Sequence, residues 1–300
     1  MPPPDARLSD FEAQRPRLLR LAYRMLGSVA EAEDIVQDAW LRWDRVEESV
    51  DAPAAYLTRV VTRLCLDQMK SARARRETYV GAWLPEPLVG TTEIEEQADD
   101  LTLTLMLALE RLSPLERAAF LLHDVFGVAL GEIATMLDRD AAAVRQLAVR
   151  ARKHVHDARP RYKVEQAEAD RITHAFFEAA RAGDPAELSA LLAEDVVVHS
   201  DGGGRVPAAI NVIYGADRVV RLFAGLVRKF DREPMLLRTV TIDGLPGLVT
   251  LDGNGVLQTT AFEIEGGRIT AIYAVRNPDK LRHVAAALDD HVAAERSTRS

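Results

Sequence analysis

Apolar residues in the first part of the chain recur at helical spacing. The i, i+3, i+4, i+7 pattern predicts one long amphipathic helix and is formed by Ala32, Ile35, Val36, Ala39, Trp40 and Trp43. The opposite side of this helix presents Asp34, Gln37, Asp38 and Leu41. Such a side is either a solvated acidic face or a docking face for a basic partner.

A second helix is predicted from about residue 54 to residue 74. Its apolar side is formed by Leu57, Val61, Leu64, Cys65 and Gln68. At about 100° per residue, four bases fall within about 80° of one another on a different side, namely Arg59, Arg63, Lys70 and Arg73. A basic stripe is usually a solvated face, but it can also neutralise several phosphates of a nucleic acid.

The segment 109–160 has the pattern of a helix-turn-helix. Ser113-Pro114-Leu115-Glu116 predicts a capped helix start, and Gly127 is placed to end that helix. A short helix over 130–137 and a turn over 138–140 precede a helix in which Asp140 is the expected N-cap. The buried stripe of that last helix is predicted to be Val144, Leu147, Ala148, Ala151 and Val155. Its other side is basic, which favours DNA binding through the major groove.

Residues 165–300 combine helical and strand patterns. Helices are predicted over 165–182, 185–193, 216–230 and 279–294, and strands over 196–199, 235–242, 248–251, 256–264 and 269–275. Residues 201–205 form a Gly-rich loop. We therefore expect a multidomain protein, with two all-α domains followed by an α+β domain built on a curved antiparallel sheet.

The net charge of −8, from 38 basic and 46 acidic residues, hides strong local differences. Residues 59–76 and 141–163 carry +5 and +6, whereas residues 85–110 carry −7, as counts of Lys and Arg minus Asp and Glu. Two basic segments in an acidic protein favour an anionic polymer as partner. The single cysteine, Cys65, rules out an intramolecular disulfide framework and a cysteine-based zinc cage. No apolar run has the length of a membrane span or a signal core, so we expect a cytoplasmic protein without membrane partners.

Several motifs carry a resemblance to a known family. The stretches 23–28 (YRMLGS) and 32–38 (AEDIVQD) resemble region 2 of sigma-70-type factors, and 111–117 (RLSPLER) with 120–127 (FLLHDVFG) resemble region 4. Regions 1 and 3 have no counterpart, which points to the extracytoplasmic-function (ECF) group. Three more motifs resemble the SigJ-type subgroup with a fused SnoaL-like C-terminal domain: Trp83-Leu84-Pro85-Glu86-Pro87, Asp201-Gly202-Gly203-Gly204-Arg205 and Asn277-Pro278-Asp279-Lys280-Leu281.

The resemblance implies a division of labour. It implies a region 2 domain (1–80), an acidic linker (81–108), a region 4 domain (109–160) and a regulatory SnoaL-like domain (165–300). Core RNA polymerase, through its β′ clamp and β subunits, would bind the face formed by Asp34, Gln37, Asp38 and Leu41. The promoter −10 element would be opened and read by Arg59, Arg63, Lys70, Arg73, Arg75 and Arg76. The −35 element would be read by Ala142, Arg145, Gln146, Arg150, Arg152 and Lys153. The three subgroup motifs would regulate activity between domains, with the 201–205 loop near the 83–87 linker segment.

Three positions depart from the family pattern. Arg63 stands where many ECF factors carry Asn facing the −10 strand, which leaves the −10 preference open. Asp138 and Asp140 stand where the turn often has Gly and Ser. Asp140 is still a competent cap, but Asp138 suits a left-handed conformation less well than Gly does.

A second interpretation places the function in the C-terminal pocket. SnoaL enzymes use an acid–base pair of the Asp/His type, and His199 and Asp201 would share one strand face. The chain would then be a DNA-binding regulator whose pocket is a small-molecule enzyme or ligand sensor. We favour a structural role for His199 and a loop-capping or interaction role for Asp201. We therefore assign no catalytic residue, no metal site and no cofactor, and leave a small ligand of the pocket open.

Overall fold

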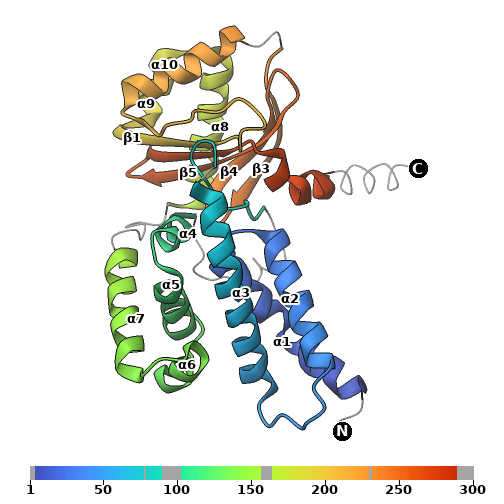
Figure 1. The fold of residues 1–300 in the computed structure, drawn as a ribbon. Helices are drawn as coiled ribbons and strands as arrows, with labels where there is room; N and C mark the ends of the chain where they lie inside the picture. Colours follow the sequence, from blue (N-terminus) through green and yellow to red (C-terminus); the bar gives the residue numbers. More distant parts are fainter. Residues whose placement is uncertain (1–3, 78, 90–102, 157–163, 230–231, 289–300) are drawn as a thin grey trace, which may run out of the picture. The chain divides into compact units, whose positions relative to one another are not determined.

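The computed structural model describes residues 4–77, 79–89, 103–156, 164–229 and 232–288, with the backbone alone at 4–5, 72–77 and 156 (Figure 1). Contacts divide the chain into two compact units. The first unit comprises residues 1–78 and 91–159, and the second comprises residues 79–90 and 160–300. The segment that carries the Trp83–Pro87 motif therefore belongs with the C-terminal part of the chain, although it lies between the two helical regions in sequence.

The first three helices of the first unit pack against one another. They are α1 (Pro4–Leu26), α2 (Val29–Asp44) and α3 (Pro53–Glu77). The two helices predicted around residues 32–43 and 54–74 are present as α2 and α3, whereas α1 was not predicted. Ser28 caps α2 by accepting a hydrogen bond from the Glu31 N–H at 3.2 Å. The shared core contains completely buried residues from all three helices, including Leu18, Tyr23 and Met25 of α1, Ala32 of α2, and Leu57 and Val61 of α3.

The second half of the first unit is the helix-turn-helix. Its helices are α4 (Leu103–Glu110), α5 (Pro114–Phe120), α6 (Leu130–Leu137) and α7 (Ala141–His156). The capping box is complete, because Ser113 and Glu116 bond each other's backbone N–H. The helix that we expected to run as far as Gly127 is α-helical only to Phe120. It continues as a π-helical turn over Leu121–Val125. Helix α4 lies partly inside the segment that we expected to be linker.

The second unit is a mixed sheet with helices on one face (Figure 1). Its helices are α8 (Gln166–Ala182), α9 (Pro185–Leu191) and α10 (Ala216–Leu226). The sheet order is β2-β1-β6-β5-β4-β3, from β1 (Leu192–Asp201), β2 (Ile213–Tyr214), β3 (Met235–Ile242), β4 (Leu245–Leu251), β5 (Leu257–Glu265) and β6 (Arg268–Val275). Short 3-10 turns cover Val227–Lys229 and Pro278–Lys280, and residues 282–288 are helical. Phe176, Leu188 and Phe262 belong to the core between helices and sheet.

The sheet differs from the expected one in three respects. Helix α9 ends at Leu191, two residues before the predicted end at 193. Strand β1 follows at once from Leu192, whereas we expected it to begin at residue 196. The short strand β2 was not predicted, since two residues give no alternation to read. Strands β1 and β6 pair in parallel, whereas every other pair is antiparallel. Hydrophobic alternation reports the buried face of a strand and not its direction relative to a distant neighbour. The end of the predicted final helix, 289–294, lies outside the described residues.

Candidate functional site

The predicted polymerase-binding face is an exposed side of α2. Asp34, Gln37 and Asp38 are exposed, and the Leu41 side chain between them and the end of the helix is 46% exposed. The other side of α2 buries Ile35, Val36 and Trp43. An exposed leucine bordered by carboxylates can contact a partner through both apolar area and charge.

The predicted −10 residues lie along α3. The Arg59 guanidinium lies 5.5 Å from the centre of the Tyr56 ring, Arg63 is exposed, and Lys70 pairs with Asp67 at 2.8 Å. Both members of that last pair are exposed, so it adds little to stability. The side chains of Arg73, Arg75 and Arg76 lie outside the described residues. Burial raises the pKa of the Cys65 thiol, which fits a core residue and not a nucleophile.

The predicted −35 residues occupy the outer side of α7. Asp140 caps the helix through the Ala143 N–H at 2.7 Å, and Asp138 adopts the left-handed conformation at φ 53°. All five residues of the predicted buried stripe are buried. Every predicted contact residue is exposed: Ala142, Arg145, Gln146, Arg150, Arg152 and Lys153. Two of them are held within the first unit, because Arg150 pairs with Glu116 at 2.7 Å and Arg152 pairs with Asp124 at 2.6 Å. Ala142, Arg145 and Gln146 stand at the helix start, where base edges are read.

An arginine seam joins the two halves of the first unit. Arg117 of α5 is buried and donates to the Met25 carbonyl and to Glu110, both at 2.7 Å. Arg17 of α1 donates to the Phe126 carbonyl at 3.2 Å and lies 5.3 Å from the centre of that ring. We call the contacts of Arg17 and Arg117 the seam.

Helix α3 also meets the helix-turn-helix. Arg63 Nε lies 3.5 Å from the Met136 carbonyl of α6. A cavity of about 310 Å³ is lined by Tyr56 and Arg59 of α3 and by Glu132, Thr135 and Met136 of α6. The predicted −10 helix therefore faces part of the predicted −35 domain.

Residues 79–89, which we call the strap, are part of the second unit. They are bound to its C-terminal segment (160–300) around Asp201. The Asp201 carboxylate is completely buried at the end of β1. Its Oδ1 accepts from the Tyr79 hydroxyl at 2.5 Å and from the Gly203 N–H at 3.0 Å. Its Oδ2 accepts from the Leu84 N–H at 2.9 Å and from Lys280 Nζ at 2.8 Å. Four donors thus compensate the desolvation of one buried charge.

Lys280 completes this site from the Asn277–Leu281 motif. Its ammonium group donates to the Leu84 carbonyl and lies 4.2 Å from the centre of the Trp83 ring. Asn277 Nδ2 lies 2.9 Å from the Tyr79 hydroxyl oxygen. Burial and the hydrogen bond to Asp201 raise the pKa of Tyr79, so its hydroxyl remains a donor. The three subgroup motifs therefore meet in one polar cluster, and Trp83 contributes a cation–π contact.

Close packing around the 201–205 loop requires glycine at two of its positions. A Cβ on Gly203 would lie 2.2 Å from Asn277 Nδ2, and one on Gly202 would lie 2.4 Å from the Val206 carbonyl oxygen. Gly203 also has φ 58°, which side chains rarely adopt. Arg205 is exposed and lies 3.3 Å from Asp279. The loop is therefore a close-packed seat for the strap.

The other end of the strap, around Leu88, is also bound to the rest of the second unit. Leu84, Pro85, Glu86, Pro87 and Leu88 are all buried. Leu88 N–H donates to Asp243 Oδ2 at 3.3 Å, and the Leu88 carbonyl accepts from the Asp243 N–H at 3.1 Å. His283 Nε2 lies 2.7 Å from the Pro87 carbonyl oxygen. Sequence reasoning missed Tyr79, Asp243 and His283, since none lies in a motif and their contacts span more than 100 residues.

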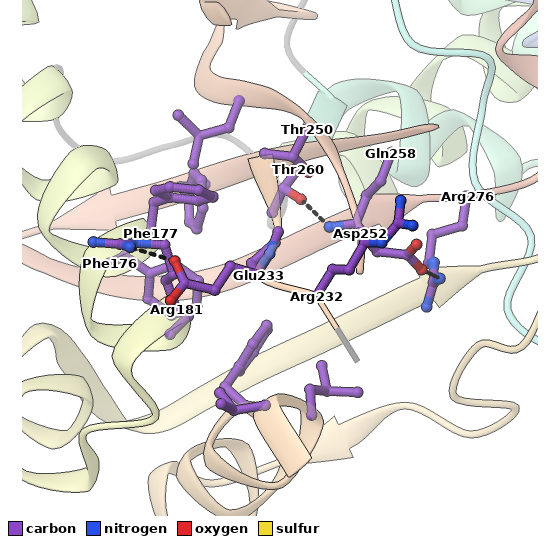
Figure 2. A pocket seen from close by; sticks show the side chains of 17 residues that line it. Phe176, Phe177, Arg181, Arg232, Glu233, Thr250, Asp252, Gln258, Thr260 and Arg276 are labelled. Atoms are coloured by element: carbon purple, nitrogen blue, oxygen red, sulfur yellow. Dashed lines mark hydrogen bonds and ion pairs between the residues drawn. The ribbon is translucent and has the colours of Figure 1, made fainter. Parts of the chain in front are cut away.

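The second unit also contains a cavity of about 220 Å³ between α8, α10 and the sheet (Figure 2). Phenyl rings line one part of it, and Arg276, Asp252 and Gln258 line another. His199 and Asp201 are not among its lining residues. The His199 ring instead stacks on Tyr273 with centroids 5.3 Å apart. The structure therefore does not bring the proposed acid–base pair to this cavity.

Among the described residues, no helix combines the length and the apolar character needed to cross a membrane. Within the same ranges, no group of three or more His, Cys, Asp or Glu side chains is arranged to hold a metal ion.

Comparison with known proteins identifies the parts of the chain. Residues 11–75 match the model of sigma-70 region 2, residues 102–155 that of sigma-70 region 4, and residues 173–284 that of the SnoaL-like domain. The chain is 40% identical over 292 residues to the ECF RNA polymerase sigma factor SigJ of Mycobacterium tuberculosis, covering 91% of this chain and 92% of that protein. It is 34% identical to the probable ECF sigma factor SigI of the same species, covering 93% and 96%.

A solved structure agrees with these matches. The crystal structure of Mycobacterium tuberculosis SigJ superposes with a TM-score of 0.71 at 35% identity, and covers 92% of this chain and 98% of that one. The helical regions, the SnoaL-like domain and the order in which they follow one another are thus shared along almost the whole length. The chain belongs to the family of ECF RNA polymerase sigma factors that carry a C-terminal SnoaL-like domain.

Proposed function

We propose that this protein binds core RNA polymerase in the cytoplasm and directs transcription from promoters with −10 and −35 elements. The observation that carries the proposal is the start of α7, where Ala142, Arg145 and Gln146 are exposed at the base-reading end of a helix-turn-helix. In this assignment α3 contributes the basic −10 surface, and Asp34, Gln37, Asp38 and Leu41 contact the β′ clamp.

The test is run-off transcription with purified core polymerase, the full chain and a library of genomic fragments. We expect initiation at discrete start sites. The double variant Asp34→Lys/Asp38→Lys should abolish it, because both charges on the docking face are reversed. Glu47→Lys/Glu48→Lys, which reverses two exposed charges beyond α2, is the matched control. Equal activity of both double variants would contradict the role of the α2 face.

Promoter binding requires the first unit to open. The −10 and −35 elements lie about 25 base pairs apart, which is about 85 Å of B-DNA at 3.4 Å per base pair. Arg63 of α3, however, contacts the Met136 carbonyl of α6. We therefore take the described arrangement as a closed form, in which the two readers would not reach both elements at once. A dye pair on Cys variants of Asp67 and Thr135 should show energy transfer in the free protein that polymerase and promoter DNA abolish.

The strap is the natural point of control in cis. It lies in the segment that joins α3 to α4, and it is bound to the second unit through Asp201, Lys280 and Asp243. Its release would make residues 79–89 available to span the distance between α3 and α4, which wide separation of the two readers needs. The SnoaL-like domain would then restrain the sigma regions until the strap is released.

The variant Trp83→Ala tests this control, because it removes the ring that covers the Lys280 ammonium group. We expect a higher rate of transcription by Trp83→Ala than by the full wild-type chain. Met235→Ala, which truncates an exposed apolar side chain of the same unit, should transcribe at the wild-type rate. Wild-type transcription and wild-type packing of Trp83→Ala would contradict regulation through the strap.

A further inference from the structure

We propose that the cavity of the second unit is a binding site for a small aromatic carboxylate. The site is shown in Figure 2, and its lining does not include the strap cluster around Asp201. Its occupancy would be communicated to the strap through the segment Arg276–Asn277, and this second step rests on the proposed regulation in cis.

The shape and lining of the cavity fit one aromatic ring. Four phenyl rings line it, from Phe176, Phe177, Phe223 and Phe262. Phe176 meets Phe223 edge to face with centroids 4.9 Å apart, and meets Phe262 at 5.1 Å. Edge-to-face contacts of this kind are how aromatic rings prefer to pack, and a further ring extends the set. The volume of about 220 Å³ is ample, since an apolar cavity of about 150 Å³ already accepts benzene.

A hydrogen-bond donor without an acceptor lies in the polar part of the same cavity. Arg276 Nη2 pairs with Asp252 Oδ2, but Arg276 Nε is buried and has no partner among the described residues. Asp252 Oδ1 accepts from the N–H groups of Asn254 and Val256, both at 2.9 Å, and Asp252 Oδ2 bonds Arg276 Nη2 and not Nε. A buried N–H without an acceptor is costly, so a ligand that brings an acceptor to Arg276 is favoured.

The charges that line the cavity favour a single negative charge on the ligand. Among the described residues, the lining has the cations Arg181, Arg232 and Arg276 and the anions Glu233 and Asp252. Arg181 pairs with Glu233 at 2.6 Å and Arg276 pairs with Asp252. Arg232 is exposed and pairs with neither of these carboxylates. The sum is one positive charge, which suits a monoanion and repels a cation.

Carboxylate is the monoanion that this arrangement fits. The planar guanidinium group bonds carboxylate oxygens in a fork, and one oxygen of the ligand can take Arg276 Nε while the ring lies among the phenyl groups. A phosphate monoester carries close to two negative charges, more than the single net positive charge of the lining balances.

The residue that would bind the ligand, Arg276, directly precedes a residue that contacts the strap, Asn277. The N–H groups of Arg276 and Asn277 both donate to the Asp201 carbonyl, at 2.7 Å and 3.0 Å. Asn277 then contacts the Tyr79 hydroxyl of the strap. A carboxylate bound at Arg276 Nε therefore contacts the residue that precedes Asn277, and a shift of Arg276 on binding would be passed to the segment that seats the strap.

Binding is tested on the full chain with benzoate, and with benzyl alcohol and benzylamine as neutral and cationic probes of the same ring. Titration calorimetry should show benzoate binding at least about tenfold more tightly than either probe, the factor expected for one charge-assisted hydrogen bond. Arg276→Gln should lose that preference and still bind benzyl alcohol. Arg228→Gln, an exposed arginine beside α10 that does not line the cavity, is the matched control and should bind as wild type does.

A second variant covers the case in which Arg276→Gln fails to fold. Ala180→Leu fills the cavity from α8 without touching a charge, and should weaken benzoate and benzyl alcohol alike. Equal affinity for benzoate and benzyl alcohol, or unchanged binding by Ala180→Leu, would overturn the site. These measurements need neither polymerase nor promoter, so they stand apart from the proposed transcription activity.

The link to the strap has its own measurement. Leu84 N–H is protected by Asp201, so hydrogen exchange of the peptide 79–89 reports strap release. Saturating benzoate should raise its exchange rate about threefold or more in the wild type and leave it unchanged in Arg276→Gln. Binding of benzoate without any change in this peptide would leave the site standing and overturn its connection to the strap.

Discussion

The strap cluster and the seam both use buried cations to join distant parts of the chain, but they differ in how completely their polar atoms are partnered. At the strap, the Asp201 carboxylate accepts from four donors and its cation Lys280 also reaches the Leu84 carbonyl. At the seam, Arg17 meets neutral carbonyl and hydroxyl groups, and Arg117 Nε has no acceptor among the described residues. The polar atoms of the strap cluster are thus satisfied like those of a protein interior, whereas the seam is incompletely satisfied, which favours the opening that we propose for the first unit.

The largest effect should come from breaking the strap cluster at its centre. Asp201→Ala removes the acceptor of four donors and leaves the Lys280 ammonium group buried without its carboxylate, which should cost about 3–5 kcal/mol of the unfolding free energy of the second unit. Urea unfolding followed by hydrogen exchange of the sheet measures it.

Asp195→Ala is the control for that variant. It removes an exposed carboxylate from the same strand and should change the unfolding free energy by less than about 0.5 kcal/mol. Similar losses in the two variants would mean that Asp201 does not hold the strap through these bonds.

The seam should tolerate a comparable loss better. Arg117→Met keeps the apolar stem of the side chain and removes the bonds to Met25 and Glu110, at a cost of about 1–3 kcal/mol. The cost is smaller because Glu110 is 14% exposed and can turn to water, whereas Asp201 cannot. Lys280→Met, measured in parallel by urea unfolding, should lose more. A greater loss for Arg117→Met would reverse the comparison.

The same contrast explains what could be predicted from the sequence. Local signals predicted the elements well: the Ser113–Glu116 capping box, the Asp140 cap and the buried stripe from Val144 to Val155 are all present. These features depend on neighbours within a few residues, which a linear pattern contains.

The contacts that the proposed regulation uses could not be derived in this way. Resemblance pointed to the 83–87, 201–205 and 277–281 motifs, but Tyr79, which bonds Asp201 and Asn277 in the same cluster, is singled out by no motif and no spacing. The bond of Arg63 to Met136 and the parallel pairing of β1 with β6 are likewise set by packing across long stretches of chain. Tertiary contacts of this kind leave no periodic trace.

An intermediate effect is expected from the hydroxyl of Tyr79. Tyr79→Phe removes its bond to Asp201 and should cost about 1–2 kcal/mol of the unfolding free energy of the second unit. The pKa of Tyr79 is raised by burial and by Asp201, whereas a tyrosine in the unfolded chain has a pKa of about 10. Above that pH the unfolded chain releases the proton and the folded chain retains it, so stability falls as pH rises.

Urea unfolding between neutral and alkaline pH isolates this contribution. The stability of the wild type should fall more steeply above about pH 10 than that of Tyr79→Phe. Tyr214→Phe, which alters an exposed tyrosine of the same unit, should keep the wild-type slope. Parallel slopes for all three proteins would show that Tyr79 does not couple the strap to pH.

The smallest effect concerns the helix that presents Arg117 to the seam. Glu116 closes the capping box of α5 and pairs with Arg150 of α7, so it fixes the start of α5 and its neighbour together. The hydrogen bond from Ser113 and the contact with Arg150 lower the pKa of Glu116. Its contribution is present above the ordinary glutamate pKa of about 4.3 and is lost as pH falls through the lower folded value. Glu116→Gln should cost about 0.5–1 kcal/mol at neutral pH and nothing in strong acid.

Thermal unfolding of the first unit at pH 7 and in acid measures that difference against Glu132→Gln, an exposed glutamate of α6. Glu132→Gln should match the wild type at both pH values. If Glu116→Gln also weakens promoter binding beyond its loss of stability, then the Arg150 pair orients α7 for DNA. If binding follows stability alone, the pair only holds α5 in place, and the seam then depends on Arg17 and Arg117 themselves.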